Sequence, residues 1–233
     1  MDLIAPGVYR LRGLIIGNVY LISDPDGVTL IDASIAPSGQ RILDQVRAVG
    51  RRLSDVRRVL VTHAHPDHVG ALPLIQRETG AEVWISALER PILEGRVAIP
   101  TPPPEKLSPL VRRLTPAPTT LPFVPAAREL YDGEVLPEVM EGLHVVATPG
   151  HAMGHIAFWH PKRRIVFCGD VIFNMTGLSL PLPFFTVDMA EDIRSIKRVL
   201  DLNPQIVCFG HGPALRHNTM AKLQQFARKV GAL

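Results

Sequence analysis

In the first third of the chain, the spacing of apolar residues changes from a β-strand pattern to a helical pattern. Three short runs have the alternation and composition of β-strands, and residues 24–27 (Asp-Pro-Asp-Gly) form a turn signal between the last two. The runs cover residues 7–11, 18–23 and 28–31. A helical period then runs from about Ser38 to Val49, and residues 59–61 have the composition of a buried strand. The pattern predicts a meander followed by strand–helix alternation.

The remainder of the chain continues this alternation. Predicted helices cover residues 69–79, 190–200 and 214–230, and predicted strands cover residues 82–85, 143–147, 156–160, 165–168 and 206–209. No short-period repeat is present, although the two halves share a β-then-α style. We expect an α/β fold with sheet inside and helices outside.

The segment at about residues 91–125 is crowded with proline, including residues 101–104 (Thr-Pro-Pro-Pro). Such a segment cannot run as one helix or as one central strand. Because the strand pattern resumes after it, we interpret it as a surface excursion of one domain that covers a pocket, rather than as a linker. We therefore expect residues 1–233 to form a single domain.

Composition and charge narrow the class of protein. The 233 residues are 46% hydrophobic and 20% charged, which is typical of a folded globular chain. The net charge of +3 and the interrupted basic run at residues 51–58 do not favour a nucleic-acid partner. No apolar run approaches the roughly 18 residues that span a bilayer, and residues 1–10 lack a secretory pattern. The two cysteines, Cys168 and Cys208, lie in apolar runs, so we expect a reduced, cytoplasmic protein. The oligomeric state is not indicated.

The strongest chemical signal is the sequence Thr-His-Ala-His-Pro-Asp-His at residues 62–68, directly after an apolar run. His-x-His-x-Asp-His arises by chance in under about one chain of this length in a thousand. A loop that leaves a strand end lets closely spaced side chains converge. Imidazole and carboxylate together suit Zn, Fe or Mn, and the lack of nearby thiolates argues against a closed structural zinc site. We expect an open, catalytic metal site.

Three further candidates each follow an apolar strand and have a glycine beside them: His151, Asp170 and His211. Singly, each is more typical of an ordinary turn residue. Together they form a pattern, because glycine permits the tight backbone that brings a ligand to a crowded centre and strand ends are where α/β sites form.

The combined set resembles the metal-ligand pattern of the metallo-β-lactamase superfamily, with a metal site like that of glyoxalase II. It consists of His63, His65, Asp67, His68, His151, Asp170 and His211. Residues 18–22 and 30–32 also resemble the opening strands of that family. The resemblance implies a four-layer αβ/βα sandwich. It implies one divalent ion on His63, His65 and His151, a second on Asp67, His68 and His211, and Asp170 between them.

The implied activity is hydrolysis of a small-molecule ester, thioester or lactone. Two divalent ions, zinc by expectation with iron or manganese as alternatives, share a bridging hydroxide that serves as the nucleophile. Asp67 is the predicted catalytic residue besides its metal role, because it can orient the water or pass a proton. His155, Asp32 and Thr62 are expected to support the ligands from behind. Phe184 and Phe185 either wall the substrate pocket or pack in the core.

The chain lacks features of several known branches of the superfamily, and these differences limit which branches it can resemble. Zinc β-lactamases with a cysteine ligand need Cys where this chain has Asp170. Glyoxalase II has a C-terminal helical domain that grips glutathione, and too little chain follows His211 to form one. Lactonases of the family commonly place a tyrosine near the bridging aspartate, and no tyrosine follows Tyr131.

Two alternatives lie outside hydrolysis. One is a mononuclear iron persulfide dioxygenase, which uses only the positions of His63, His151 and Asp170, a set suited to non-haem iron. The other is a metal-binding module without catalysis. The seven filled ligand positions argue against the second.

Overall fold

The computed structural model describes residues 1–233, and the first half of the chain forms a seven-stranded sheet. Its strands lie in chain order: β1 (Asp2–Ala5), β2 (Val8–Arg10), β3 (Tyr20–Asp24), β4 (Gly27–Ile31), β5 (Val56–Leu60), β6 (Glu82–Ser86) and β7 (Arg128–Leu130). The first four pair antiparallel as a meander, and β4 to β7 pair parallel. Parallel pairing gathers the carboxyl ends of β4, β5 and β6 at one edge.

A five-stranded sheet forms the second half, in the order β14-β11-β10-β9-β8. Its strands are β8 (Val135–Leu136), β9 (Leu143–Ala147), β10 (Ile156–His160), β11 (Ile165–Gly169) and β14 (Ile206–Phe209). Only β11 and β14 pair parallel. A separate two-stranded ribbon joins β12 (Phe173–Asn174) to β13 (Leu178–Ser179).

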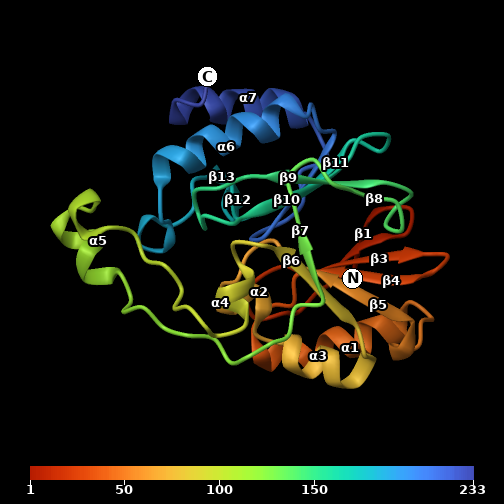
Figure 1. Ribbon diagram of the computed structural model, residues 1–233. Helices are drawn as coiled ribbons and strands as arrows, with labels where there is room; N and C mark the ends of the chain where they lie inside the picture. Colours follow the sequence, from red (N-terminus) through yellow and green to blue (C-terminus); the bar gives the residue numbers. More distant parts are fainter.

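Helices cover the outer faces of both sheets (Figure 1). The long helices are α1 (Gly39–Ala48), α3 (Leu72–Thr79), α6 (Met189–Asp201) and α7 (Thr219–Val230); the short ones are α2 (Pro66–Val69), α4 (Arg90–Leu93) and α5 (Pro109–Leu114). Helices α1 and α3 lie against the first sheet, and α6 and α7 lie against the second. The predicted αβ/βα sandwich is therefore confirmed.

Alternation along each strand builds three separate cores. In β3, Leu21 packs with the residues of α1 and α3, whereas Tyr20 and Ile22 point into the space between the sheets. In β11, Phe167 joins the core between the sheets, and Val166 packs beneath α6 and α7. Successive side chains of a strand point to opposite faces of the sheet. A strand that is apolar on both faces therefore contributes side chains to two cores, one on each side of the sheet.

Two predicted helices have different boundaries. The predicted helix 69–79 is broken: α2 ends at Val69 and α3 begins at Leu72. A Cβ at Gly70 would lie 2.7 Å from the backbone nitrogen of Ala36, so the chain passes too close to its neighbour for a side chain there. The predicted helix 214–230 begins only at Thr219, because Leu215 pairs with Val207 and Asn218 has a left-handed φ of 54°.

The proline-rich segment 91–125 contains no strand. It holds the end of α4, a 3₁₀ turn η3 (Pro104–Lys106) and α5, and α5 packs against a second 3₁₀ turn, η4 (Pro183–Phe185). Lys106 also binds Asp188, with Nζ 3.0 Å from a carboxylate oxygen. The excursion thus lies beside the segment that carries Phe184 and Phe185. No helix in the structure combines the length and the apolarity needed to cross a membrane.

Candidate metal centre

Three histidines reach the centre from the segment after β5. The chain leaves the strand at Leu60, and Pro66 begins α2, so His63 and His65 lie on the connecting loop and His68 on the helical turn. All three side chains are buried. The loop and the turn let the three side chains converge, which a regular strand would prevent.

His151, Asp170 and His211 arrive from the ends of β9, β11 and β14. Glycine is required beside two of them. A Cβ at Gly210 would lie 1.9 Å from a carboxylate oxygen of Asp170, and a Cβ at Gly150 would lie 2.2 Å from the backbone nitrogen of Asp192. The structure thus brings together all seven residues that the sequence singled out, in overlapping groups whose ligand atoms lie within 4.8 Å of one another.

Asp170 lies between two groups of side chains. One group is His63, His65 and His151, and the other is Asp67, His68 and His211. The Oδ2 atom of Asp170 lies 3.5 Å from Nε2 of His151 and 3.2 Å from Nε2 of His211, and its Oδ1 atom lies 3.3 Å from Nε2 of His68. A carboxylate so placed faces both groups at once.

Asp32 and Thr62 orient two of the imidazoles. Asp32 accepts a hydrogen bond from the backbone N–H of Thr62 at 2.8 Å, and its other oxygen lies 2.8 Å from Nδ1 of His68. The Thr62 hydroxyl lies 3.0 Å from Nδ1 of His63. With each Nδ1 engaged, the Nε2 atoms of His63 and His68 face the centre, as is usual for histidines that bind metals.

Both ring nitrogens of His155 are engaged by neighbouring protein groups. Its Nδ1 lies 2.8 Å from the Thr148 hydroxyl, and its Nε2 accepts the backbone N–H of Asp170 at 3.1 Å. Burial lowers the pKa of His155 to about 3, so the ring is neutral. This residue therefore positions Asp170 rather than offering a nitrogen to a cation.

The donor set fits divalent cations. Nε2 of His63, Nε2 of His68 and Oδ1 of Asp170 are buried and have no hydrogen-bond partner. An unpaired buried polar atom costs free energy, about 1–3 kcal/mol each, and a bound cation relieves that cost. Neutral imidazole and carboxylate without thiolate suit Zn, Fe or Mn.

The two groups differ in charge. Burial lowers the pKa of His63 and His151 well below the ordinary value, and that of His65 to about 4, so this group is neutral. Burial also disfavours charge on His68 and His211, but nearby carboxylates outweigh it: those of Asp170, Asp32 and Asp67 for His68, and those of Asp170 and Asp67 for His211. The pKa of His68 is raised, and that of His211 rises to about 9.

The same contacts act in reverse on the two carboxyls. Burial alone would raise the pKa of Asp67, yet His68 and His211 hold it at about 2. The pKa of Asp170 is likewise held well below its ordinary value. The carboxyls of Asp67 and Asp170 are therefore both ionised, as cation binding requires.

Glu89 joins the two ligand loops, and sequence reasoning missed it. Its side chain is buried at the start of α4, where one oxygen accepts the backbone N–H of Ala64 and the other that of Gly154, each at 2.9 Å. Ala64 lies between His63 and His65, and Gly154 precedes His155. No local sequence pattern marks such a residue, because its partners are backbone amides far away in the chain.

Replacing Glu89 by alanine is expected to weaken metal binding about 10- to 100-fold, the usual effect of removing a group that orients ligands. Titration against a competing chelator measures this affinity. The matched control is Glu78→Ala, which removes an exposed carboxylate on α3 and should bind metal like the wild type. A folded Glu89→Ala protein with unchanged affinity would show that the link is dispensable.

Asp192 is a second buried acid near the site. It lies on α6 against the backbone of Gly150, and neither carboxylate oxygen has a well-formed hydrogen bond. Burial raises the pKa of Asp192 to about 8, although the backbone N–H of His151 partly offsets this. Since the folded pKa exceeds the unfolded one, the free energy of unfolding should fall as pH rises from about 4 to about 8.

The Asp192→Asn variant is expected to lose this pH dependence. Relative to the wild type, the metal-free variant should gain stability between pH 5 and pH 9, by at least about 1 kcal/mol. Urea unfolding of both chelated proteins at the two pH values measures the difference. Parallel stability curves would contradict the assignment.

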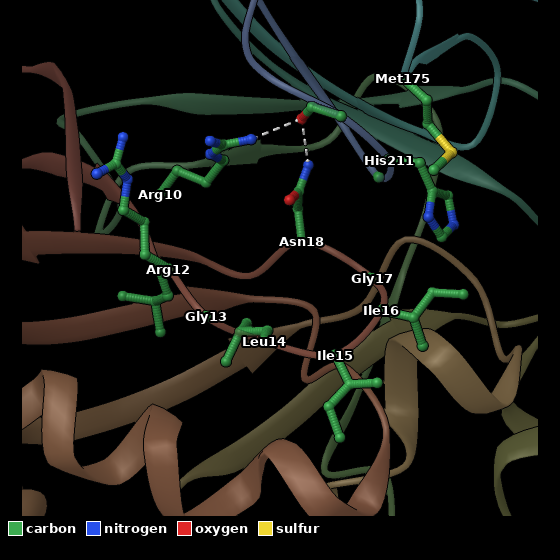
Figure 2. Close-up of a pocket in the computed structure, with 13 residues that line it drawn as sticks. Arg10, Arg12, Gly13, Leu14, Ile15, Ile16, Gly17, Asn18, Met175 and His211 are labelled. Carbon is green, nitrogen blue, oxygen red and sulfur yellow. Dashed lines mark hydrogen bonds between the residues drawn. The ribbon is translucent and has the colours of Figure 1, made fainter.

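A pocket of about 320 Å³ opens onto the ligand residues. Phe185 lines it, whereas Phe184 does not and instead packs against Phe185 with ring centroids 4.8 Å apart. A smaller cavity of about 250 Å³ adjoins it along residues 10–18 (Figure 2), and the two share Ile16, Met175 and His211. Ile16 and Met175 were missed because an apolar residue in a loop carries no sequence signal.

Comparison with known proteins places this site in a family. Residues 12–211 match the Metallo-beta-lactamase superfamily. The chain is similar to the probable metallo-hydrolase YflN of Bacillus subtilis (strain 168), at 28% identity over 98% of this chain and 93% of that protein. It is also similar to the hydroxyacylglutathione hydrolase GloC of Haemophilus influenzae, at 29% identity over 77% of this chain and 79% of GloC.

A solved structure with a similar fold supports the same family assignment. The protein TTHA1623 in a di-iron-bound form superposes with a TM-score of 0.66 at 30% identity, covering 92% of this chain and 96% of that chain. The family match, the fold and the gathered histidines and aspartates agree with one another. The chain therefore belongs to the metallo-β-lactamase superfamily and is one of its metal-dependent hydrolases.

Proposed function

We propose that this protein is a dinuclear metal-dependent hydrolase that cleaves a small-molecule ester, thioester or lactone. The observation that carries the proposal is the position of Asp170 between two three-residue groups, each of which offers ligand atoms to one cation. The mononuclear alternative needs only His63, His151 and Asp170, and it leaves the second group without a role. The di-iron form of TTHA1623 supports the dinuclear reading.

In this proposal His63, His65 and His151 would hold one cation, Asp67, His68 and His211 would hold the other, and Asp170 would serve both. When bound, a pair of divalent cations lowers the pKa of water and stabilises the negative charge that develops on the substrate oxygen. The sequence favours zinc, with iron or manganese as alternatives. In the reaction the water oxygen forms a bond to the acyl carbon, the acyl bond to oxygen or sulfur breaks, and the leaving group takes a proton.

Asp67 is the protein group best placed to orient the attacking water. Its side chain is 25% exposed, whereas that of Asp170 is 4% exposed, and Asp67 lines the pocket. Its pKa of about 2 keeps the carboxylate ionised, so it accepts a hydrogen bond from water. His211, with Nε2 3.2 Å from Oδ2 of Asp67, fixes the carboxylate.

Several observations support a small substrate and a cytoplasmic location. The pocket lies at the lower end of the roughly 300–1,000 Å³ that ligand sites occupy. Thioester cleavage gains support from the similarity to GloC, whose name describes hydrolysis of an acylglutathione. Cys168 and Cys208 are buried and free, as in proteins of a reducing compartment.

The test is a panel of esters, lactones, thioesters and phosphodiesters assayed with the metal-loaded protein, alongside oxygen uptake with glutathione persulfide. We expect hydrolysis of at least one carbonyl substrate and no oxygen uptake. Oxygen uptake by a protein with one iron would establish the dioxygenase instead. Failure to hydrolyse any member of the panel would favour a non-catalytic metal-binding module.

A further inference from the structure

Apart from the candidate metal ligands, the side chains that line the pocket are all apolar. Its lining comprises seven apolar residues and five polar ones: Ile16, Ile35, Pro66, Phe173, Met175, Leu182 and Phe185, with His65, Asp67, His151, Asp170 and His211. Every polar lining residue is thus a candidate metal ligand. Beyond the reacting carbonyl, a substrate meets only apolar side chains.

Two arginines border the adjoining cavity, and both are paired. Arg10 and Arg12 each have a guanidinium nitrogen 2.6 Å from a carboxylate oxygen of Asp2. Arg10 also donates to the carbonyl of Gly212 at 2.9 Å, and Figure 2 shows both arginines on the side of the cavity away from His211. Neither arginine lines the pocket over the ligand residues.

The apolar lining continues outward as an exposed rim. Met175 is 69% exposed, Ile16 46%, Leu182 45% and Phe185 44%. In Figure 2 the side chains of Ile16 and Met175 lie on opposite sides of the His211 imidazole. A group of large exposed apolar residues around a cavity marks a binding site for apolar groups, because leaving them in water is unfavourable.

We infer that the substrate is an uncharged ester, thioester or lactone whose acyl chain is apolar and lies against Ile16, Met175 and Phe185. This inference rests on the proposed function and adds the substrate class. It predicts that an acyl group ending in a carboxylate is a poor substrate, because the pocket lining holds no lysine or arginine to bind that carboxylate.

A series of nitrophenyl esters from acetyl through butanoyl and hexanoyl to octanoyl tests the chain preference. We expect kcat/KM to rise about threefold for each methylene until the pocket is filled. The monoester of adipic acid has the carbon number of the hexanoyl ester with a terminal carboxylate. It should be slower by at least about tenfold, because the carboxylate would be desolvated without a partner.

The Phe185→Ala variant should lower the hexanoyl-to-acetyl ratio of kcat/KM by about tenfold, since a ring that covers the chain is lost. Met175→Ala, at a residue 69% exposed whose loss cannot disturb the core, should lower the same ratio about threefold. Phe123→Ala is the matched control, because Phe123 is 67% exposed and lies outside the pocket. It should leave the ratio unchanged.

Calorimetric binding of unreactive N-methyl amides of the same acyl chains, from acetyl to octanoyl, to the metal-loaded protein separates this inference from the proposed function. Affinity that grows with the length of the acyl chain, and that Phe185→Ala weakens, supports the apolar site even if no ester is cleaved. Cleavage with equal kcat/KM for acetyl and octanoyl esters, or for hexanoyl and adipoyl esters, would overturn the inference and leave the hydrolase intact.

Discussion

The Asp170→Ala variant is expected to lower kcat/KM for the best substrate by at least about 10³-fold, which corresponds to about 4 kcal/mol of transition-state stabilisation. The reason is the position of the carboxylate between Nε2 of His68, Nε2 of His151 and Nε2 of His211. Without it, the two groups of ligands lose the carboxylate between them, whose negative charge would offset the repulsion between two cations. Steady-state kinetics and metal content per chain are the measurements.

The control for this prediction is Asp201→Ala, which removes an exposed carboxylate near the end of α6 that pairs with Lys197. Its activity and metal content should match those of the wild type. Since Asp170 is one of the carboxylates that raise the pKa of His68 and of His211, the metal-free Asp170→Ala variant should show a lower pKa for both residues. An Asp170→Ala protein with activity within tenfold of the wild type would show that Asp170 does not hold the metals.

Chelation is expected to abolish hydrolysis and to lower the melting temperature by about 5–10 °C. A ligand present at 100 times its dissociation constant stabilises the folded state by about 2.7 kcal/mol, and a chain of this size shifts by about 2–4 °C per kcal/mol. The loss follows from the buried ligand atoms of His63, His68 and Asp170, which form no hydrogen bond within the protein. Differential scanning calorimetry with and without chelator measures it.

Readdition of zinc, manganese or ferrous iron should restore both activity and melting temperature, and the most effective metal identifies the preferred one. The Asp170→Ala protein should respond much less to chelator. A wild-type melting temperature that chelator leaves unchanged would mean that the seven residues carry no cation in the folded protein.

Much of the fold was predictable because the chain alternates between two clear apolar periods. The strands at 143–147, 156–160 and 206–209 lie where the pattern put them. Errors arose where tertiary contacts override the local period. Helical spacing extends back to residue 214, but Leu215 pairs with Val207 and Asn218 turns the backbone, so α7 begins at Thr219. The short edge strands β7 and β8 have too few residues for any period to be visible.

The candidate site was predictable to different degrees. Residues 62–68 could be identified from the sequence alone, because four side chains able to bind a metal lie within seven positions. His151, Asp170 and His211 are each weak candidates singly and carry weight only when they are considered together, and the structure gathers them with the others. Glu89 was invisible, because its two hydrogen bonds go to backbone amides on different loops. The metal-ligand roles of all seven remain predictions.

Anomalous diffraction from crystals of the metal-loaded protein tests the central claim most directly. We predict two peaks for each chain, one among His63, His65 and His151 and the other among Asp67, His68 and His211, with Asp170 contacting both. A single peak, or peaks outside these side chains, would contradict the account.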